Sequence, residues 1–213
     1  MKRMLPCIVV LSLLLSGCIS PKKADLTAFR ANPPRSIVVV PVVNESPEIT
    51  ASSIFTPTLT IPLAERGYYV FPVYLTEMLL RDLGLSEAGH IHLMPPNRFQ
   101  ELFGADAVLF VTIKSWSTKY IVLSSSVEIS AEYVLKDTRT GTVLWKGSQQ
   151  VVQASGNGGG GLIGALVAAA VHAMITDYKP LARQANGTAF LPPHGLPAGP
   201  YHSEYGKDQS RFE

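Results

Sequence analysis

The chain has 213 residues, with 18 Lys and Arg against 16 Asp and Glu, and only two cysteines. This nearly neutral composition excludes a strongly basic nucleic-acid-binding surface and a polybasic membrane patch. The length suits one folded domain with a sizeable hydrophobic core.

The amino-terminal residues have the pattern of a bacterial lipoprotein signal peptide. A basic start is followed by an apolar run over residues 5–15, which has about half of the ~20 residues that a membrane-spanning helix needs. The run ends in a lipobox whose small residues leave room for a signal peptidase, Leu15-Ser16-Gly17-Cys18. We therefore predict cleavage of residues 1–17 and attachment of a diacylglycerol and an N-acyl chain to Cys18, with no other cofactor.

The cysteines and the residue after the lipobox indicate the compartment. Cleavage removes Cys7 and leaves Cys18, already used by the lipid, so we expect no disulfide and no thiolate metal site. Lipobox proteins with aspartate after the cysteine are usually kept at the inner membrane, whereas here the position is Ile19. We expect a protein that its lipid holds on the outer membrane, on the periplasmic face.

Residues 18–35 are polar, contain Pro33-Pro34 and are typical of a tether behind the lipidated cysteine. Fully extended, residues 19–35 would span at most ~60 Å. The globular domain is predicted over residues 36–185. It opens with Ile37–Val43, a largely β-branched run that indicates a strand buried on both faces.

Residues 44–71 combine proline-containing and β-prone segments. Pro57 and Pro62 argue against one unbroken helix, and a short helical turn is expected from Pro62 to Gly67. Residues 68–71 are typical of a second strand.

An amphipathic helix is predicted next. Its apolar residues recur at helical spacing and should pack against the sheet: Leu75, Met78, Leu79 and Leu83. A brief helix should follow from Asn97, as its N-cap, to Gly104, and a strand over residues 107–113. This alternation favours a parallel or mixed sheet with helices against it.

The second half has the pattern of an antiparallel hairpin. Residues 127–135 alternate apolar and polar side chains, Asp137–Gly141 has turn chemistry, and residues 143–152 supply the return strand. The hairpin should form one edge of the sheet. The predicted fold class is therefore α/β, a single two-layer or three-layer domain whose mixed sheet is parallel in its first half and antiparallel in the hairpin.

Glycines at 156–161 precede an apolar helix predicted over residues 162–175. Small residues spaced by four form stripes on it that would let another backbone approach closely. We predict a self-assembly interface there, with packing of the helix on its own sheet as the alternative. The residues assigned to this interface are Gly160, Gly161, Gly164, Ala165, Ala168 and Ala169. Residues 186–213, rich in Pro and Gly, predict a disordered tail or an arm laid on a partner.

Two aromatic residues are candidates for a partner contact. Trp116 and Tyr120 should face the same side of a strand and could anchor an interface. Cross-strand packing of these aromatics is the alternative.

No catalytic or metal constellation is evident. His90 and His92, predicted to share a face of a strand, lack a third ligand nearby, and His172 on the apolar helix is typical of an interior histidine. The serines at 124–126 lack the glycine-flanked elbow of a serine nucleophile. We predict neither a metal site nor an enzyme.

Several segments in a fixed order carry a family resemblance: the lipobox, Ile37–Val43, Pro62–Pro72, Gly104–Ala107, Asp137–Gly141 and Trp145. With these segments the chain resembles a family of uncharacterised proteobacterial lipoproteins that includes a neisserial genome-derived antigen. The match covers nearly the whole mature chain, and no single motif is diagnostic alone.

The resemblance implies a small α/β domain similar to the amino-terminal domain of TolB and to the periplasmic domains of the lipoproteins CsgG, LpoB and PelC. It also implies assembly of the chain with itself and with a curli-secretion-like lipoprotein. The Gly104–Ala107 turn is shared with that wider group and implies a role in the fold. No functional residue carries over.

These observations favour a non-enzymatic, homo-oligomeric outer-membrane lipoprotein that is an accessory component of an envelope transport or secretion assembly. Two alternatives stay open. One is a regulator of peptidoglycan synthesis, which the short tether disfavours because such activators reach through the cell wall. The other is a lipoprotein that binds a small ligand.

Overall fold

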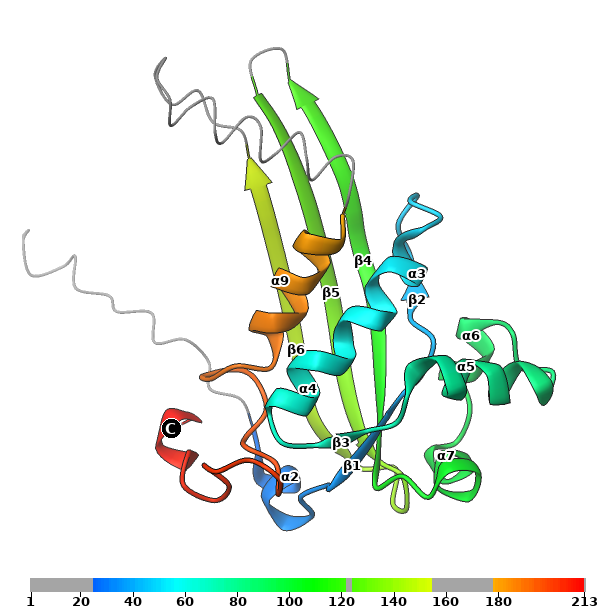
Figure 1. The fold of residues 1–213 in the computed structure, drawn as a ribbon, viewed down its shortest axis with the longest axis vertical. Coiled ribbons are helices and arrows are strands. Elements are labelled where there is room, and N and C mark those ends of the chain that lie inside the picture. Colours follow the sequence, from blue (N-terminus) through cyan, green and yellow to red (C-terminus); the bar gives the residue numbers. More distant parts are fainter. Residues whose placement is uncertain (1–24, 122–123, 155–177, 213) are drawn as a thin grey trace, which may run out of the picture.

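The computed structural model describes residues 25–121, 124–154 and 178–212 (Figure 1). Within them a six-stranded mixed sheet has the order β3-β1-β4-β5-β6, and β2 pairs with β4 beside β1. The strands are β1 (Ser36–Val39), β2 (Val43–Asn44), β3 (Tyr69–Val70), β4 (Ala107–Ile121), β5 (Ser124–Asp137) and β6 (Val143–Ala154). The signal peptide, Cys18 and the small-residue stripe over 160–169 lie outside the described residues.

The sheet confirms the predicted mixed topology. Strand β1 is parallel to β3 and β4, whereas β4, β5 and β6 form an antiparallel meander. The predicted strand 37–43 is split into β1 and β2, both paired with β4. Pro41 lies in the break between them. A proline is tolerated there because no backbone hydrogen bond to the neighbouring strand is needed from it.

Helices cover the two faces of the sheet (Figure 1). On one face lie α3 (Ala51–Phe55), the 3₁₀ turn η2 (Thr56–Leu59), α4 (Thr60–Glu65) and α9 (Lys179–Ala189). On the other lie α5 (Val73–Asp82), α6 (Ala88–His92) and α7 (Pro96–Phe103). Two short elements, α2 (Thr27–Ala31) and η3 (Gln209–Phe212), stand near the starts of β1 and β6.

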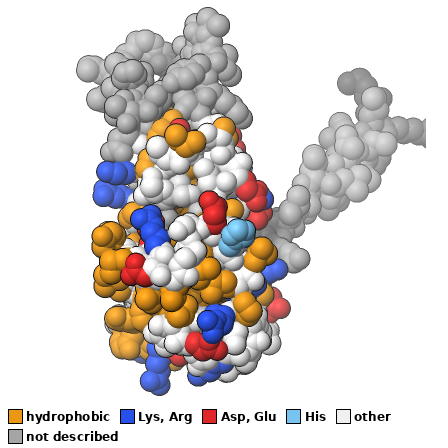
Figure 2. Space-filling view, turned by 90° about the vertical axis from the view of Figure 1, so that its right-hand side faces the viewer, with side chains coloured by type: hydrophobic (Ala, Val, Ile, Leu, Met, Phe, Trp, Pro, Cys, Tyr) orange, Lys and Arg blue, Asp and Glu red, His pale blue; other side chains and the backbone are white. Residues whose placement is uncertain are grey.

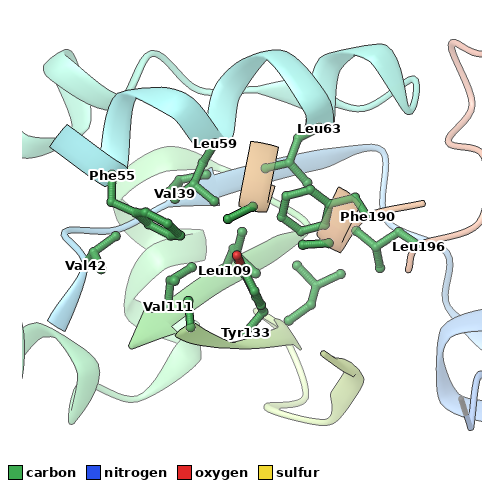
Figure 3. Close-up of a cluster of buried hydrophobic side chains, with 14 of the residues drawn as sticks. Val39, Val42, Phe55, Leu59, Leu63, Leu109, Val111, Tyr133, Phe190 and Leu196 are labelled. Atoms are coloured by element: carbon green, nitrogen blue, oxygen red, sulfur yellow. The ribbon is translucent and has the colours of Figure 1, made fainter. Parts of the chain in front are cut away.

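The main core fills the first interface. Figure 3 shows Phe55, Leu59 and Leu63 pointing from the helices toward Val39, Leu109 and other strand residues. A smaller cluster on the opposite face joins Leu80, Ile91 and Phe99 to the strand residues Val38 and Val108. The domain therefore has three layers where β1 and β4 are covered on both sides.

The helical run before β3 is longer than predicted. It begins at Ala51 rather than at Pro62 and continues as three pieces to Glu65. Pro57 lies in the first turn of η2, where its missing N–H is no loss. Likewise, α7 begins at Pro96 with Pro95 at the N-cap, so Asn97 is not the cap.

The tail is not the disordered or extended arm that its composition predicted. Residues 179–189 form α9, and the chain beyond it folds back onto the domain, with Phe190, Leu196 and Phe212 in the main core. The Arg66 guanidinium, buried under this tail, donates to the carbonyl oxygen of Leu196 and to the Asp208 carboxylate (2.7 Å). The globular domain therefore extends past residue 185 to the end of the described chain.

The predicted tether is also shorter than its composition suggested. Leu26 and Phe29, on and before α2, are buried in the main core. Burial of two large apolar side chains stabilises this attachment by several kcal/mol, at ~2 kcal/mol each. Residues 26–35 therefore belong to the folded body.

Candidate interaction surface

The outward side of α5 exposes several large apolar side chains. The helix buries only Thr76 and Leu80, while Tyr74, Leu75 and Met78 are 73%, 51% and 45% exposed. Met78 is four positions from Tyr74 and three from Leu75, so its side chain neighbours both. Leu83, at the C-cap, is also exposed. We call Tyr74, Leu75, Met78 and Leu83 the α5 face.

The α5 face reverses a prediction from the sequence. The apolar positions 75, 78 and 83 were expected to pack on the sheet, but the structure turns them to solvent and buries the intervening stripe. In Figure 2, orange side chains gather on this side of the molecule. Contiguous apolar patches larger than a few hundred Å² are rare on monomeric proteins and mark protein or membrane contacts. Tyr74 could have indicated this from the sequence. With Tyr74 included, the apolar residues of α5 cover a wider arc than one face packed on the sheet can bury.

Charge on the α5 face is arranged within one helix. Glu77 and Arg81 form an exposed ion pair four residues apart. The neighbouring edge strand β3 adds an exposed ring, Tyr69, whose edge meets Phe71 at 5.1 Å between ring centroids. The sheet edge beside α5 is only two residues long, which gives little backbone for strand addition. Contacts at this surface would therefore be made by side chains.

The histidines do not form a metal site in the described part of the chain. His90 and His92 lie on α6, not on a strand, and the described residues hold no group of three metal ligands. His92 Nε2 donates to the Pro41 carbonyl oxygen (3.0 Å), and its ring meets Phe110 edge-on. Burial lowers the pKa of His92, and Lys136 lowers it further, against the opposing bond to Pro41. His92 therefore joins α6 to the break between β1 and β2.

Trp116 is a core residue, which corrects its assignment to a partner contact. Its side chain is 1% exposed and its ring meets Phe55 and Tyr178 edge-on. A register shift of β4 between Ile113 and Ser115 keeps both Ile113 and Trp116 on the buried side. The backbone of Tyr120 lies in β4, and its side chain is outside the described residues.

Two surface hollows are open rather than enclosed. A groove of about 710 Å³ runs between the α3 to α4 run and α9, lined by Ile54, Pro57, Ile61 and Arg183. A smaller one of about 210 Å³ lies between α2 and the tail, lined by Phe29 and Tyr205. Neither has the closed apolar form with convergent polar groups that a small-ligand site usually shows.

The motif residues of the family resemblance have structural roles. The Asp106 carboxylate accepts the backbone N–H groups of Arg35 and Ser36 at the start of β1, and Gly104 ends α7 with φ of 68°. The Asp137 carboxylate accepts the N–H groups of residues 139 and 140 in the hairpin turn. These residues therefore fix strand starts and turns.

Gly67 is needed where the tail docks. It has φ of 83°, and a Cβ added there would lie 2.5 Å from the Cβ of His202. The neighbouring Tyr68 hydroxyl donates to the Pro197 carbonyl oxygen (2.6 Å), and burial raises the pKa of Tyr68 well above its ordinary value. The Arg66-Gly67-Tyr68 stretch therefore binds the chain's own carboxy-terminal tail.

Comparison with known proteins gives the family. Residues 24–191 match the family described as lipoprotein GNA1162-like. The chain belongs to the GNA1162-like lipoprotein family. The lipoprotein NMB1124/NMB1162 of Neisseria meningitidis serogroup B is 38% identical over 179 residues, which are 83% of each chain. This finding confirms the resemblance stated from the sequence.

A solved structure of a GNA1162 lipoprotein agrees with this fold. The crystal structure of lipoprotein GNA1162 from Neisseria meningitidis has a TM-score of 0.56 and 38% identity, over 68% of this chain and 100% of that one. The LpoB C-terminal domain from Salmonella enterica has a TM-score of 0.41 and 21% identity, over 59% and 90%. At that identity and score, LpoB carries no inference about function.

Family membership makes this GNA1162-like chain a lipoprotein. Among the described residues, no helix has the length and apolar character needed to cross a membrane. Residues 192–212, which pack on the Arg66-Gly67-Tyr68 stretch, lie beyond the range of the family match.

Proposed function

We propose that this protein is a non-enzymatic lipoprotein, anchored in the outer membrane through acyl chains on Cys18, that forms a homo-oligomer within an envelope transport or secretion assembly. The lipobox and the family support the anchoring. The exposed α5 face is the observation that carries the assembly role, because its aromatic and aliphatic side chains have no cover in the described chain.

The occupant proposed for the α5 face is a second copy of this chain. Two α5 helices that cross antiparallel about a two-fold axis at Met78 would pack Met78 of one copy against Met78 of the other. The same axis would place Tyr74 of each copy opposite Asp82 of the other, so that a hydroxyl donor meets a carboxylate. The patch is therefore self-complementary, as a two-fold interface requires.

The test is the mass in solution of residues 19–213, measured by light scattering over a range of concentrations. Met78→Glu should weaken association at least about tenfold, because it places a charge in the buried centre of the contact. Ile49→Glu is the matched control, since Ile49 is exposed on a loop away from α5. Equal masses for the native protein and both variants would remove the α5 face from the proposal.

Crosslinking tests the two-fold geometry itself. Residues 19–213 hold no cysteine, so Met78→Cys should form a disulfide-linked dimer on mild oxidation, because the axis brings the two positions together, whereas Ile49→Cys should not. Failure of Met78→Cys to crosslink would exclude this arrangement. The predicted stripe over residues 160–169 is tested in the same assay by Ala165→Leu with Ala169→Leu, which should yield a folded monomer if that stripe also holds copies together.

A further inference from the structure

The attachment of α2 fixes where the folded body meets its anchor. Leu26 and Phe29 are 4% and 3% exposed and belong to the same core cluster as Phe212 from the end of the tail. The backbone N–H of Arg30 donates to the Leu26 carbonyl oxygen, which holds the start of α2. From Leu26 onward the chain is therefore part of the domain.

This attachment shortens the reach of the body from the membrane. Residues 19–25 are all that separates Cys18 from Leu26, and even fully extended they reach only ~25–30 Å. A tether that included residues 26–35 would have reached ~60 Å. If Cys18 carries the lipid, the α2 end of the domain must stay close to the bilayer.

The same end exposes side chains suited to a headgroup region. Tyr201 is 70% exposed and Tyr205 is 46% exposed, on the tail that packs beside α2. Tyrosine is favoured at membrane interfaces, because its ring is apolar and its hydroxyl is polar. Arg30 and Tyr205 line the hollow between α2 and the tail, and Lys207 and Arg211 are exposed on the same tail.

The ion pairs at this end leave a small excess of basic residues. Asp208 is buried against Arg66 and Glu204 lies 3.9 Å from Arg211, so each pair is neutral. Asp25 is exposed, and the N–H of Thr27 donates to its carboxylate. Cationic side chains near an anionic lipid surface each contribute about 1 kcal/mol. Charge at this end therefore favours anionic headgroups modestly, while the short tether imposes the proximity.

We propose that the end formed by α2 and residues 197–212 is the surface that lies on the lipid headgroups, with Tyr201 and Tyr205 at the interface. The proposal rests on lipidation of Cys18, which is part of the proposed function. Figure 1 places α2 and the carboxy-terminal segment at one end of the long strands. The strands then run away from the membrane, and the α5 face stands beside them, open to copies anchored in the same bilayer.

Depth-dependent quenching on the full lipidated protein tests this orientation. Because Cys18 is blocked by lipid, an introduced cysteine is the single free thiol for a fluorophore. Ser203→Cys and Ser210→Cys probe the proposed surface. Val152→Cys is the control, because it is exposed on β6 nine residues beyond Val143, or ~30 Å along the strand.

The labelled proteins are placed in vesicles of phosphatidylethanolamine and phosphatidylglycerol that contain a headgroup spin-labelled lipid. Labels at 203 and 210 should lose at least about half of their fluorescence, and the label at 152 should lose little. Equal quenching at all three positions, or stronger quenching at 152, would overturn the proposed orientation.

Sedimentation of membranes from cells separates failure of the orientation from failure of the anchor. Native protein should sediment with the membranes, and residues 19–213 exported behind a cleavable signal sequence that lacks a lipobox should stay in the soluble fraction. If this unlipidated form sediments like the native protein, the lipid anchor in the proposed function is wrong, and the orientation proposal falls with it. If anchoring holds but the labels at 203 and 210 are not quenched, only the orientation is wrong.

Discussion

The two faces of the sheet use similar amphipathic helices in opposite ways. The α3 to α4 run buries Phe55, Leu59 and Leu63 completely, because α9 and the tail pack around it. The α5 helix turns most of its large apolar side chains to solvent, because no further described element covers it. An apolar stripe in a sequence therefore predicts that one side of a helix makes apolar contacts. It does not show whether those contacts are with the same chain or with a partner.

Polar contacts sharpen the contrast between the faces. On the α9 side, the Tyr133 hydroxyl donates to Asn186, and the Asn186 amide donates to the Thr58 hydroxyl, each at 2.8 Å and all buried. On the α5 side, edge-on ring contacts such as Phe99 with Phe110 dominate. A buried hydrogen-bond network in which every group is paired favours a single arrangement of its side chains. The α9 side therefore has the larger and more specifically packed core, and the α5 side has the smaller one.

The largest effect is expected where the tail enters the core. Phe190→Ala should lower the free energy of unfolding by about 3–5 kcal/mol, because Phe190 is fully buried against Tyr133 and Trp145. Urea denaturation measures the change. Phe103→Ala on the α5 side is the control and should cost about 1 kcal/mol, since Phe103 is only half-buried. Equal losses would erase the distinction between the faces.

The next effect compares two ion pairs. Asp208→Asn leaves the buried Arg66 charge without its partner and should cost about 3 kcal/mol in urea denaturation. Glu77→Gln, in the exposed pair with Arg81, should change stability by less than about 1 kcal/mol. A small loss for Asp208→Asn would mean that the tail detaches at little cost and that its docking is not part of the stable fold.

Local patterns predicted the sheet better than the tail. The alternation over 127–135 and the turn at 137–141 specify the hairpin, because their contacts are close in sequence. Helix α9 contains Asn186 and Gly187, weak helix formers, and is held by burial and by the bond from Tyr133. The tail has no periodicity, and its bonds to Arg66 join residues 130 and 142 positions apart. Such pairings leave no local signal.

The sequence predicted the position of α5 but not the exposure of its apolar residues. Helical spacing located α5 and its apolar residues, but their exposure depends on which chain segments remain to cover them. Trp116 shows the converse, since a residue chosen as a partner contact from its polar neighbours is buried by a strand irregularity. For α5 and β4, sequence patterns thus found the element, and three-dimensional packing decided which of its sides faces outward.

The smallest expected effect is a pH dependence of the free energy of unfolding, which arises from His92 on the α5 side of the sheet. Burial lowers the pKa of His92 below its ordinary value of about 6.5, so protonation favours the unfolded chain. Neutral His92 contributes its stability fully above the unfolded pKa, and this contribution is lost as pH falls through that value toward the lower folded pKa. Native protein should therefore lose more stability between about pH 7.5 and pH 5 than His92→Gln does.

Urea titrations at the two pH values measure this difference. His90→Gln is the matched control, because the His90 ring is exposed on the same helix, and it should retain the native response. An unchanged response in His92→Gln would place the acid sensitivity elsewhere. A lost response would show that protonation of His92, whose bond to Pro41 ties α6 to the β1 to β2 break, is the source of the acid sensitivity.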